Sequence, residues 1–317
     1  MTCRPLHSRP SRRLFRGFTL VELLVATAIL SVLLVTLAQT ASTVANIWTS
    51  GNNRAERRQS GRAMVDFVAR ELKGASLPAN LGALSTRPNL QFLVNPPSVP
   101  AEFRHPHALF WQAPIATDTS RGNMAEAGYF VRWTGNRAML CRFFLNPTDP
   151  NYLIYTNGRQ DTWVNAQVIN DVAPADNNTP SGGQPNAYRG LFAENVVGFW
   201  ARCMDGKGKA VTNTPTQGFD SRLPYLSTGA NGAAVTVEAP TLPKSVEVSL
   251  VLLDSRTADL LAASTQASSL KTTIQGLTAT SVNAADFVAK AANDGSLAPL
   301  LKGMTAHQLR VFLDNAP

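Results

Sequence analysis

The sequence has few of the residues that usually carry catalysis or metal binding. Its 317 residues include 3 cysteines and 4 histidines, and Cys3 and His7 stand close to the start. Neither a G-x-x-x-x-G-K-[ST] phosphate loop nor a G-x-S-x-G nucleophile elbow occurs. We therefore expect a protein that is not an enzyme and that holds no cofactor and no metal ion.

The other candidate ligands stand apart from one another. His105 and His107 flank a proline, but no cysteine or acid lies near them at metal spacing, so we expect them on a surface loop. Asp176 and Asp205 are isolated and lack the repeated carboxylates of a calcium loop, which predicts turn residues. The tryptophans are expected in the core rather than on a platform that stacks nucleic-acid bases. They are Trp111, Trp133, Trp163 and Trp200.

Acidic residues are absent from the first 17 positions, which hold five arginines. These are Arg4, Arg9, Arg12, Arg13 and Arg16. The net charge of +8 at first suggests a protein that binds anions, but without these arginines it falls to +3. A nucleic-acid partner is therefore not indicated.

Proline is absent from Phe18 to Leu77, which allows one helix of about 60 residues. Its first part, Phe18 to Ala38, is apolar and at ~1.5 Å per residue would span the hydrocarbon core of a bilayer. The arginines before it would hold the N-terminus in the cytoplasm. Glu22 interrupts this run, and burying its carboxylate in lipid costs free energy unless a partner is supplied.

Two ordinary interpretations leave part of this segment unexplained. A cleaved secretory signal has an apolar stretch of roughly 7 to 15 residues, whereas this run is longer and only a poor cleavage site, QTASTVA, follows it. A plain signal anchor fits the length and the topology. It gives no reason for Glu22.

In residues 17–24, GFTLVELL, the small residue Gly17 directly precedes Phe18, and the carboxylate of Glu22 follows Phe18 by four residues. This stretch resembles the N-terminus of type IV prepilins and type II secretion pseudopilins. The resemblance implies that prepilin peptidase cuts after Gly17 and methylates Phe18. In a filament, the Phe18 ammonium of one subunit would then meet Glu22 of its neighbour. Leaving such a buried charge unpaired costs roughly 3 to 5 kcal/mol, which would select the axial register.

The outer half of the predicted helix is amphipathic. Met64, Phe67, Val68 and Leu72 recur at helical spacing and predict the stripe on which a β-sheet packs. The neighbouring arginines are expected on a solvated face. They are Arg54, Arg57, Arg58, Arg62 and Arg70.

Beyond Gly74 the pattern becomes strand-like. After a connecting region at 75–107, strands are predicted at 108–115, 195–205 and 242–254. Residues 127–133 and 138–145 predict a hairpin around T-G-N-R. Residues 171–190 and 212–232 are expected as long loops.

Alternation within the strands predicts which side chains face the core. We expect Arg132 and Arg142 on one face of the hairpin and Cys141 on the other. In the same way Cys203 is expected to face inward and Arg202 outward. Two cysteines on core faces permit a disulfide between Cys141 and Cys203. Two separate buried thiols fit the same count.

The order of the β-segments is similar to the J-type minor pseudopilin of type II secretion systems and to the pilin-like protein C of Verru_Chthon gene cassettes. We expect an α+β fold: a long N-terminal helix on an antiparallel β-domain, with an Ala/Leu-rich helical C-terminal region that ends in a strand. The predicted segments are a cleaved leader (1–17), a membrane and filament-core helix (18–38), its amphipathic continuation (39–74), a β-rich periplasmic domain (75–254) and a helical tail (255–317).

The resemblance implies a minor pilin or pseudopilin, because a head of over 200 residues packs poorly at every step of a tight helix. Expected partners are prepilin peptidase, other pilin subunits, an assembly platform and the inner membrane, which the chain would cross once. One alternative is a minor pilin that binds a ligand for adhesion or DNA uptake through its long loops. Another is a periplasmic enzyme on a signal anchor.

Overall fold

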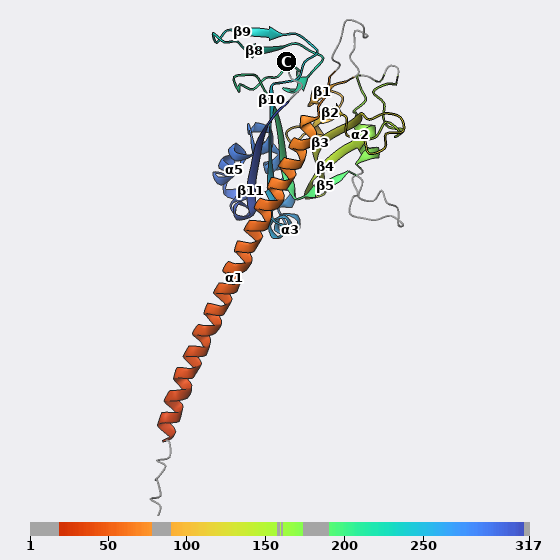
Figure 1. Cartoon of the computed structure of the whole chain (residues 1–317). Coiled ribbons are helices and arrows are strands. Elements are labelled where there is room, and N and C mark those ends of the chain that lie inside the picture. Colours follow the sequence, from red (N-terminus) through yellow and green to blue (C-terminus); the bar gives the residue numbers. More distant parts are fainter. Residues whose placement is uncertain (1–18, 78–89, 157–158, 160, 174–189, 314–317) are drawn as a thin grey trace, which may run out of the picture. The chain divides into compact units, whose positions relative to one another are not determined.

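The computed structural model describes residues 19–77, 90–156, 159, 161–173 and 190–313. The chain forms two compact units, Met1–Arg54 and Ala55–Pro317, and each is described by itself (Figure 1). The helices are α1 (Leu20–Lys73), α2 (Ala166–Val172), α3 (Ser255–Ala263), α4 (Ala267–Thr280) and α5 (Ala284–Ala292). The strands are β1 (Phe92–Val94), β2 (Leu109–Ala113), β3 (Ala125–Thr134), β4 (Arg137–Leu145), β5 (Leu191–Glu194), β6 (Val196–Met204), β7 (Phe219–Asp220), β8 (Tyr225–Thr228), β9 (Ala234–Val237), β10 (Ser245–Leu253) and β11 (Met304–Phe312). The fold is α+β, as expected.

A six-stranded antiparallel sheet has the order β5-β4-β3-β2-β1-β7. The predicted hairpin is β3 and β4, whose two-residue turn places Thr134 opposite Arg137. Gly135 has a φ of +57° there, which glycine adopts without steric cost. Both faces of this sheet are buried, so its strands lack a solvent face.

The predicted facing of the two hairpin arginines is wrong. Because Thr134 lies opposite Arg137, even-numbered residues of β3 lie opposite odd-numbered residues of β4. Arg132 therefore shares a face with Cys141, whereas Arg142 lies opposite Tyr129 on the other face. Arg132 is buried, and its guanidinium donates to the carbonyl of Ala173 and to the side chain of Asn170. The prediction failed because it assumed that even-numbered residues of both strands share one face, whereas the two-residue turn pairs even-numbered residues with odd-numbered ones.

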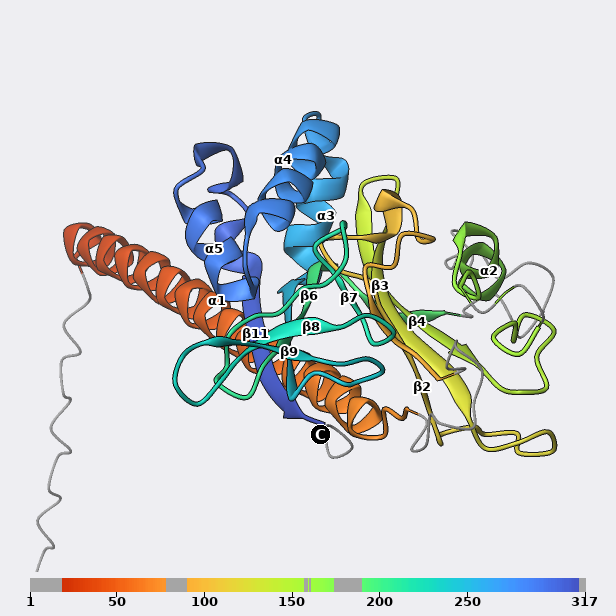
Figure 2. The same ribbon diagram turned by 90° about the horizontal axis from the view of Figure 1, so that it is seen from above.

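A second, three-stranded sheet has the order β11-β10-β6. The central strand β10 is buried along its whole length. On one face Trp200 Nε1 donates to the carbonyl of Ser281, and Ser249 Oγ accepts from the Ala284 N–H, so α4 and α5 cover this side (Figure 2). The helical segment after β10 therefore shares a sheet and a core with the β-rich segment before it.

The outer half of α1 packs where the stripe of apolar residues predicts. Val68 and Leu72 are fully buried in the same cluster as Tyr129 and Phe199, and Met64 and Phe67 pack against it in part. Arg58, Arg62 and Arg70 are exposed, which confirms a solvated face for these three. The outer half of α1 thus packs against both sheets of its unit and contributes to their common core.

Two segments expected as irregular contain more structure. The connecting region holds β1, and the expected loop at 212–232 holds β7 and β8, so that expectation was wrong in part. Asp205 lies in a turn, as predicted: its carboxylate accepts from the backbone N–H groups of Lys207, Lys209 and Thr228. These bonds hold its pKa below the ordinary value although burial opposes them. Asp176 and most of 171–190 lie outside the described residues.

Glu126 is the least expected residue of the core. Its side chain is fully buried beside Gln112, its cross-strand neighbour, and neither carboxylate oxygen makes a hydrogen bond of ordinary geometry. Burial raises the pKa of Glu126 well above its usual value, and the charge of Asp149 adds to the rise while the Ile154 amide opposes it. The folded state therefore holds this proton at a pH at which the unfolded chain has released it.

We expect the Glu126→Gln chain to be more stable than the parent at neutral pH. The folded protein binds more protons here than the unfolded chain, so the stability of the parent falls as pH rises above the unfolded pKa of about 4.3. The glutamine cannot ionise, and its advantage grows with pH. Denaturant unfolding from pH 4 to 8 measures this difference. A constant difference across that range would contradict the assignment.

Candidate functional site

The amino-terminal end of α1 places Thr19 and Glu22 against each other. The Thr19 N–H and hydroxyl both donate to Glu22 Oε2 at 3.0 Å, and the Glu22 N–H donates to Thr19 Oγ1 at 3.3 Å. This reciprocal arrangement is a capping box, which satisfies backbone donors that no helical carbonyl can reach. A carboxylate in the first turn is also stabilised by the helix dipole. Glu22 therefore has a local role in starting the helix.

The part of α1 that follows is apolar on all sides. Leu20–Val44 has a mean hydropathy of 2.5 and is the one helix among the described residues long and apolar enough to cross a membrane. No part of that window is buried within the chain. The hydroxyls in it bond to carbonyls of their own helix, as Thr27 does to Leu24 and Ser31 to Thr27. The segment therefore presents side chains that need an apolar environment supplied from outside the chain.

The proposed cleavage and methylation positions, Gly17 and Phe18, lie outside the described residues. Their roles stay predictions. The structure describes the residues that directly follow Phe18: Thr19 is the N-cap of α1, and the helix begins at Leu20.

Comparison with known protein families finds one match in this region. Residues 12–38 match the model of the prokaryotic N-terminal methylation motif. The chain carries the methylation motif of prepilins. Together with the apolar helix, this motif supports a type IV pilin- or pseudopilin-like protein. No curated protein and no solved structure matches this chain.

The prepilin motif points to a structural subunit rather than to an enzyme, to processing by a peptidase and to assembly with other pilins. The apolar helix near the N-terminus fits a signal-anchored membrane protein. Because the motif covers only the N-terminal segment, it gives no information on the β-rich unit of this prepilin-like chain.

Within the second unit, Glu71 joins the prepilin-like helix to the six-stranded sheet. Its carboxylate accepts from the Tyr129 hydroxyl, from Arg142 Nε at 3.2 Å and from Arg142 Nη2. Burial and the neighbouring Glu71 charge raise the pKa of Tyr129, so its hydroxyl remains a donor. The guanidinium of Arg142 lies 4.0 Å from the ring centroid of Phe144, a cation–π contact. This cluster fixes how the helix lies on the strands.

Cys141 and Cys203, the two cysteines among the described residues, are free thiols, and both are buried. Cys203 belongs to the cluster around α1, whereas Cys141 lies in a second cluster on the opposite face of the six-stranded sheet. Burial raises the pKa of Cys141 to about 12 and raises the pKa of Cys203 as well, so neither thiol is reactive. The disulfide that the even count permits is not formed in this structure.

The two histidines of the HPH segment are not on a free surface loop, which corrects that prediction. The backbone of this segment pairs with β6: the Phe199 N–H donates to the His105 carbonyl, and the His107 N–H donates to the Phe199 carbonyl. Both rings are partly buried, and burial lowers the pKa of each to about 4. No group of three or more metal-binding side chains occurs in the described parts of the chain.

The sequence interpretation missed two of these features. The T-x-x-E spacing of Thr19 and Glu22 is a known capping signature and could have been found. The pairing of Glu71 with Arg142 could not, because the two residues come together only when the strand registers are known.

Proposed function

We propose that this chain is a minor pilin or pseudopilin subunit that is cleaved after Gly17, methylated at Phe18 and assembled through α1 into a type IV pilus-like or type II secretion-like filament. The observation that carries the proposal is the methylation motif at residues 12–38 on an apolar helix whose surface is bare within the chain. The Arg-rich segment before the helix supports a cytoplasmic N-terminus and a periplasmic β-domain.

Cleavage would change the charge at one position. It turns the amide of Phe18 into an ammonium, four residues from Glu22. In a filament that ammonium and the Glu22 carboxylate of a neighbouring subunit would lie at one depth in an apolar environment, where each needs the other. The unprocessed chain has no such ammonium, so processing would permit assembly.

The mass of the membrane-extracted protein tests the processing. We expect a chain that begins with methylated Phe18 and lacks the first 17 residues. A Gly17→Val chain, in which the small residue is replaced, should keep its leader. A parent chain that begins at Met1 or near Ser42 would instead indicate a plain anchor or a secretory signal.

A further inference from the structure

A cleft of about 300 Å³ opens on the second unit between β6, the segment that precedes and includes β7, and the end of α4. Its apolar lining includes Val94, Val211 and Phe219. Its polar lining includes His107, Arg202 and Thr212, and no acidic residue is among the described residues that line it. The volume is at the lower end of ligand pockets, which hold roughly 300 to 1,000 Å³.

His107 gives the cleft a hydrogen-bond donor of fixed position. Its Nδ1 accepts from the Ala201 N–H at 2.9 Å, so the proton of the neutral ring is on Nε2. This Nε2 has no partner among the described residues. Burial, aided by the charge of Arg202, lowers the pKa of His107 to about 4, which keeps the ring neutral at pH 7.

Arg202 gives the cleft a positive charge that is only partly neutralised, because its partner Glu247 also faces Arg310. Arg202 Nη1 lies 3.2 Å from Glu247, and Arg310 Nη2 lies 3.7 Å from the same carboxylate. The three residues oppose one another across β6, β10 and β11. Two guanidinium groups thus share one carboxylate, and the row carries one excess positive charge.

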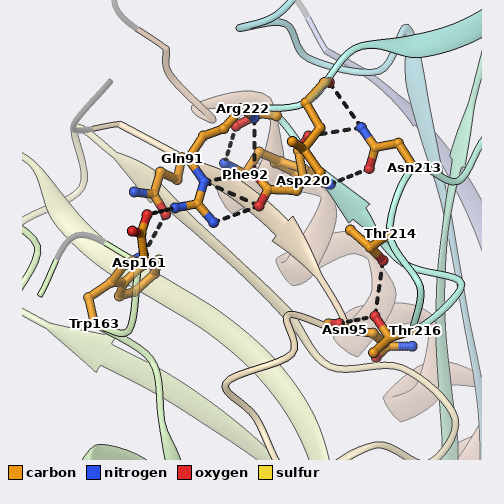
Figure 3. Close-up of polar contacts among 12 residues, drawn as sticks. Gln91, Phe92, Asn95, Asp161, Trp163, Asn213, Thr214, Thr216, Asp220 and Arg222 are labelled. Atoms are coloured by element: carbon orange, nitrogen blue, oxygen red, sulfur yellow. Dashed lines mark hydrogen bonds and ion pairs between the residues drawn. The ribbon is translucent and has the colours of Figure 1, made fainter. Parts of the chain in front are cut away.

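The loop wall of the cleft is held in place by polar contacts of its own (Figure 3). The Asn213 side chain accepts from the Asp220 N–H at 2.8 Å and donates to the Asp220 carbonyl at 2.9 Å. Thr216 Oγ1 donates to the Asn95 carbonyl at 2.6 Å. Arg222 then bonds both Asp220 and Asp161. Because these contacts fix the wall in the free protein, a ligand would find the site already formed.

We propose that this cleft binds a carboxylate, either of a small organic acid or of a polypeptide C-terminus, through His107 Nε2–H and the guanidinium of Arg202. A short aliphatic group next to the carboxylate would contact the apolar lining residues of the cleft. This binding is separate from filament assembly through α1, so either proposal can fail without the other.

The test uses the full-length protein in detergent with its histidines ¹³C-labelled at Cε1. The His107 signal is assigned by its loss in His107→Gln. The probes are sodium butyrate, the tripeptide Ala-Ala-Val and the same peptide as its C-terminal amide. We expect a saturable shift of the His107 signal with a carboxylate probe and none with the amide. Saturation by butyrate alone indicates a small acid, and saturation by the free peptide alone indicates a chain terminus. No saturable shift with either carboxylate, or an equal one with the amide, overturns the proposal.

A matched pair of variants separates the cleft from the fold. Ala279 is exposed on α4 and lines the cleft, whereas Thr272, two turns earlier, is exposed and does not. We expect Ala279→Phe to abolish binding, Thr272→Phe to preserve it, and Arg202→Gln to weaken it about tenfold, or ~1.4 kcal/mol. Equal affinity in the two phenylalanine variants contradicts the assignment, whether or not Arg202→Gln folds.

Discussion

The Glu22→Gln chain is expected to enter the membrane and lose its leader, yet to be absent from filaments. The substitution removes the charge that would meet the Phe18 ammonium of a neighbour. An unpaired buried charge costs roughly 3 kcal/mol or more, which corresponds to an approximately hundredfold loss of incorporation. Quantifying the subunit in sheared filaments and in the membrane fraction measures this loss.

The capping box at the start of α1 makes Glu22→Gln a clean test. Glutamine serves at this position of a capping box as glutamate does, so the variant keeps the hydrogen bond to the Thr19 N–H and loses only the charge. Thr19→Ala does the reverse, because it removes the cap and keeps the carboxylate. We expect Thr19→Ala to assemble. Should Glu22→Gln assemble as well as the parent, or should Thr19→Ala fail equally, the carboxylate would have only its local role.

Glu71→Ala is expected to destabilise the second unit by about 3 to 5 kcal/mol. The substitution leaves the Tyr129 hydroxyl and the Arg142 guanidinium without their common acceptor, and both are largely buried. Breaking a buried pair from one side costs more than the pair contributes, since the remaining charge stays out of water. Denaturant unfolding of the full-length protein in detergent, followed by tryptophan fluorescence, gives the change in free energy.

Asp66→Ala is the control for this prediction. Asp66 lies on the same helix, one turn and a half before Glu71, and is exposed. Its removal should change the stability by no more than about 0.5 kcal/mol. Glu71→Gln should fall between the two, because its amide can accept from Tyr129 but cannot neutralise Arg142. If Glu71→Ala has the same free energy of unfolding as Asp66→Ala, the helix is held by apolar packing alone.

The elements of this fold were predictable where a local sequence pattern is enough to define them. The absence of proline and the apolar run predict α1, and the turn residues predict the hairpin of β3 and β4. The stripe of Val68 and Leu72 predicts which face of the helix is buried. Each of these signals is local, and the structure has each of them.

The features that the sequence did not reveal depend on pairing between distant segments. Alternation cannot identify an outward face when both faces of a sheet are covered, so it could not show that Arg132 is buried. The positions of His107 and Arg202 in one cleft follow from the bridge between the HPH segment and β6. Glu126 shows no pattern that distinguishes it from a solvated glutamate.

In the second unit, α1 and β11 lie side by side and run in the same direction. Gly61 lies against the ring of His307, where a Cβ atom would come within 2.1 Å of it, and Ala69 to Lys73 border the groove formed with Leu309 to Phe312. A force along the helix axis would act on all these contacts at once, in shear, and would not separate them one after another. In the proposed filament, tension along α1 would therefore reach the second unit through contacts that have to break at the same time.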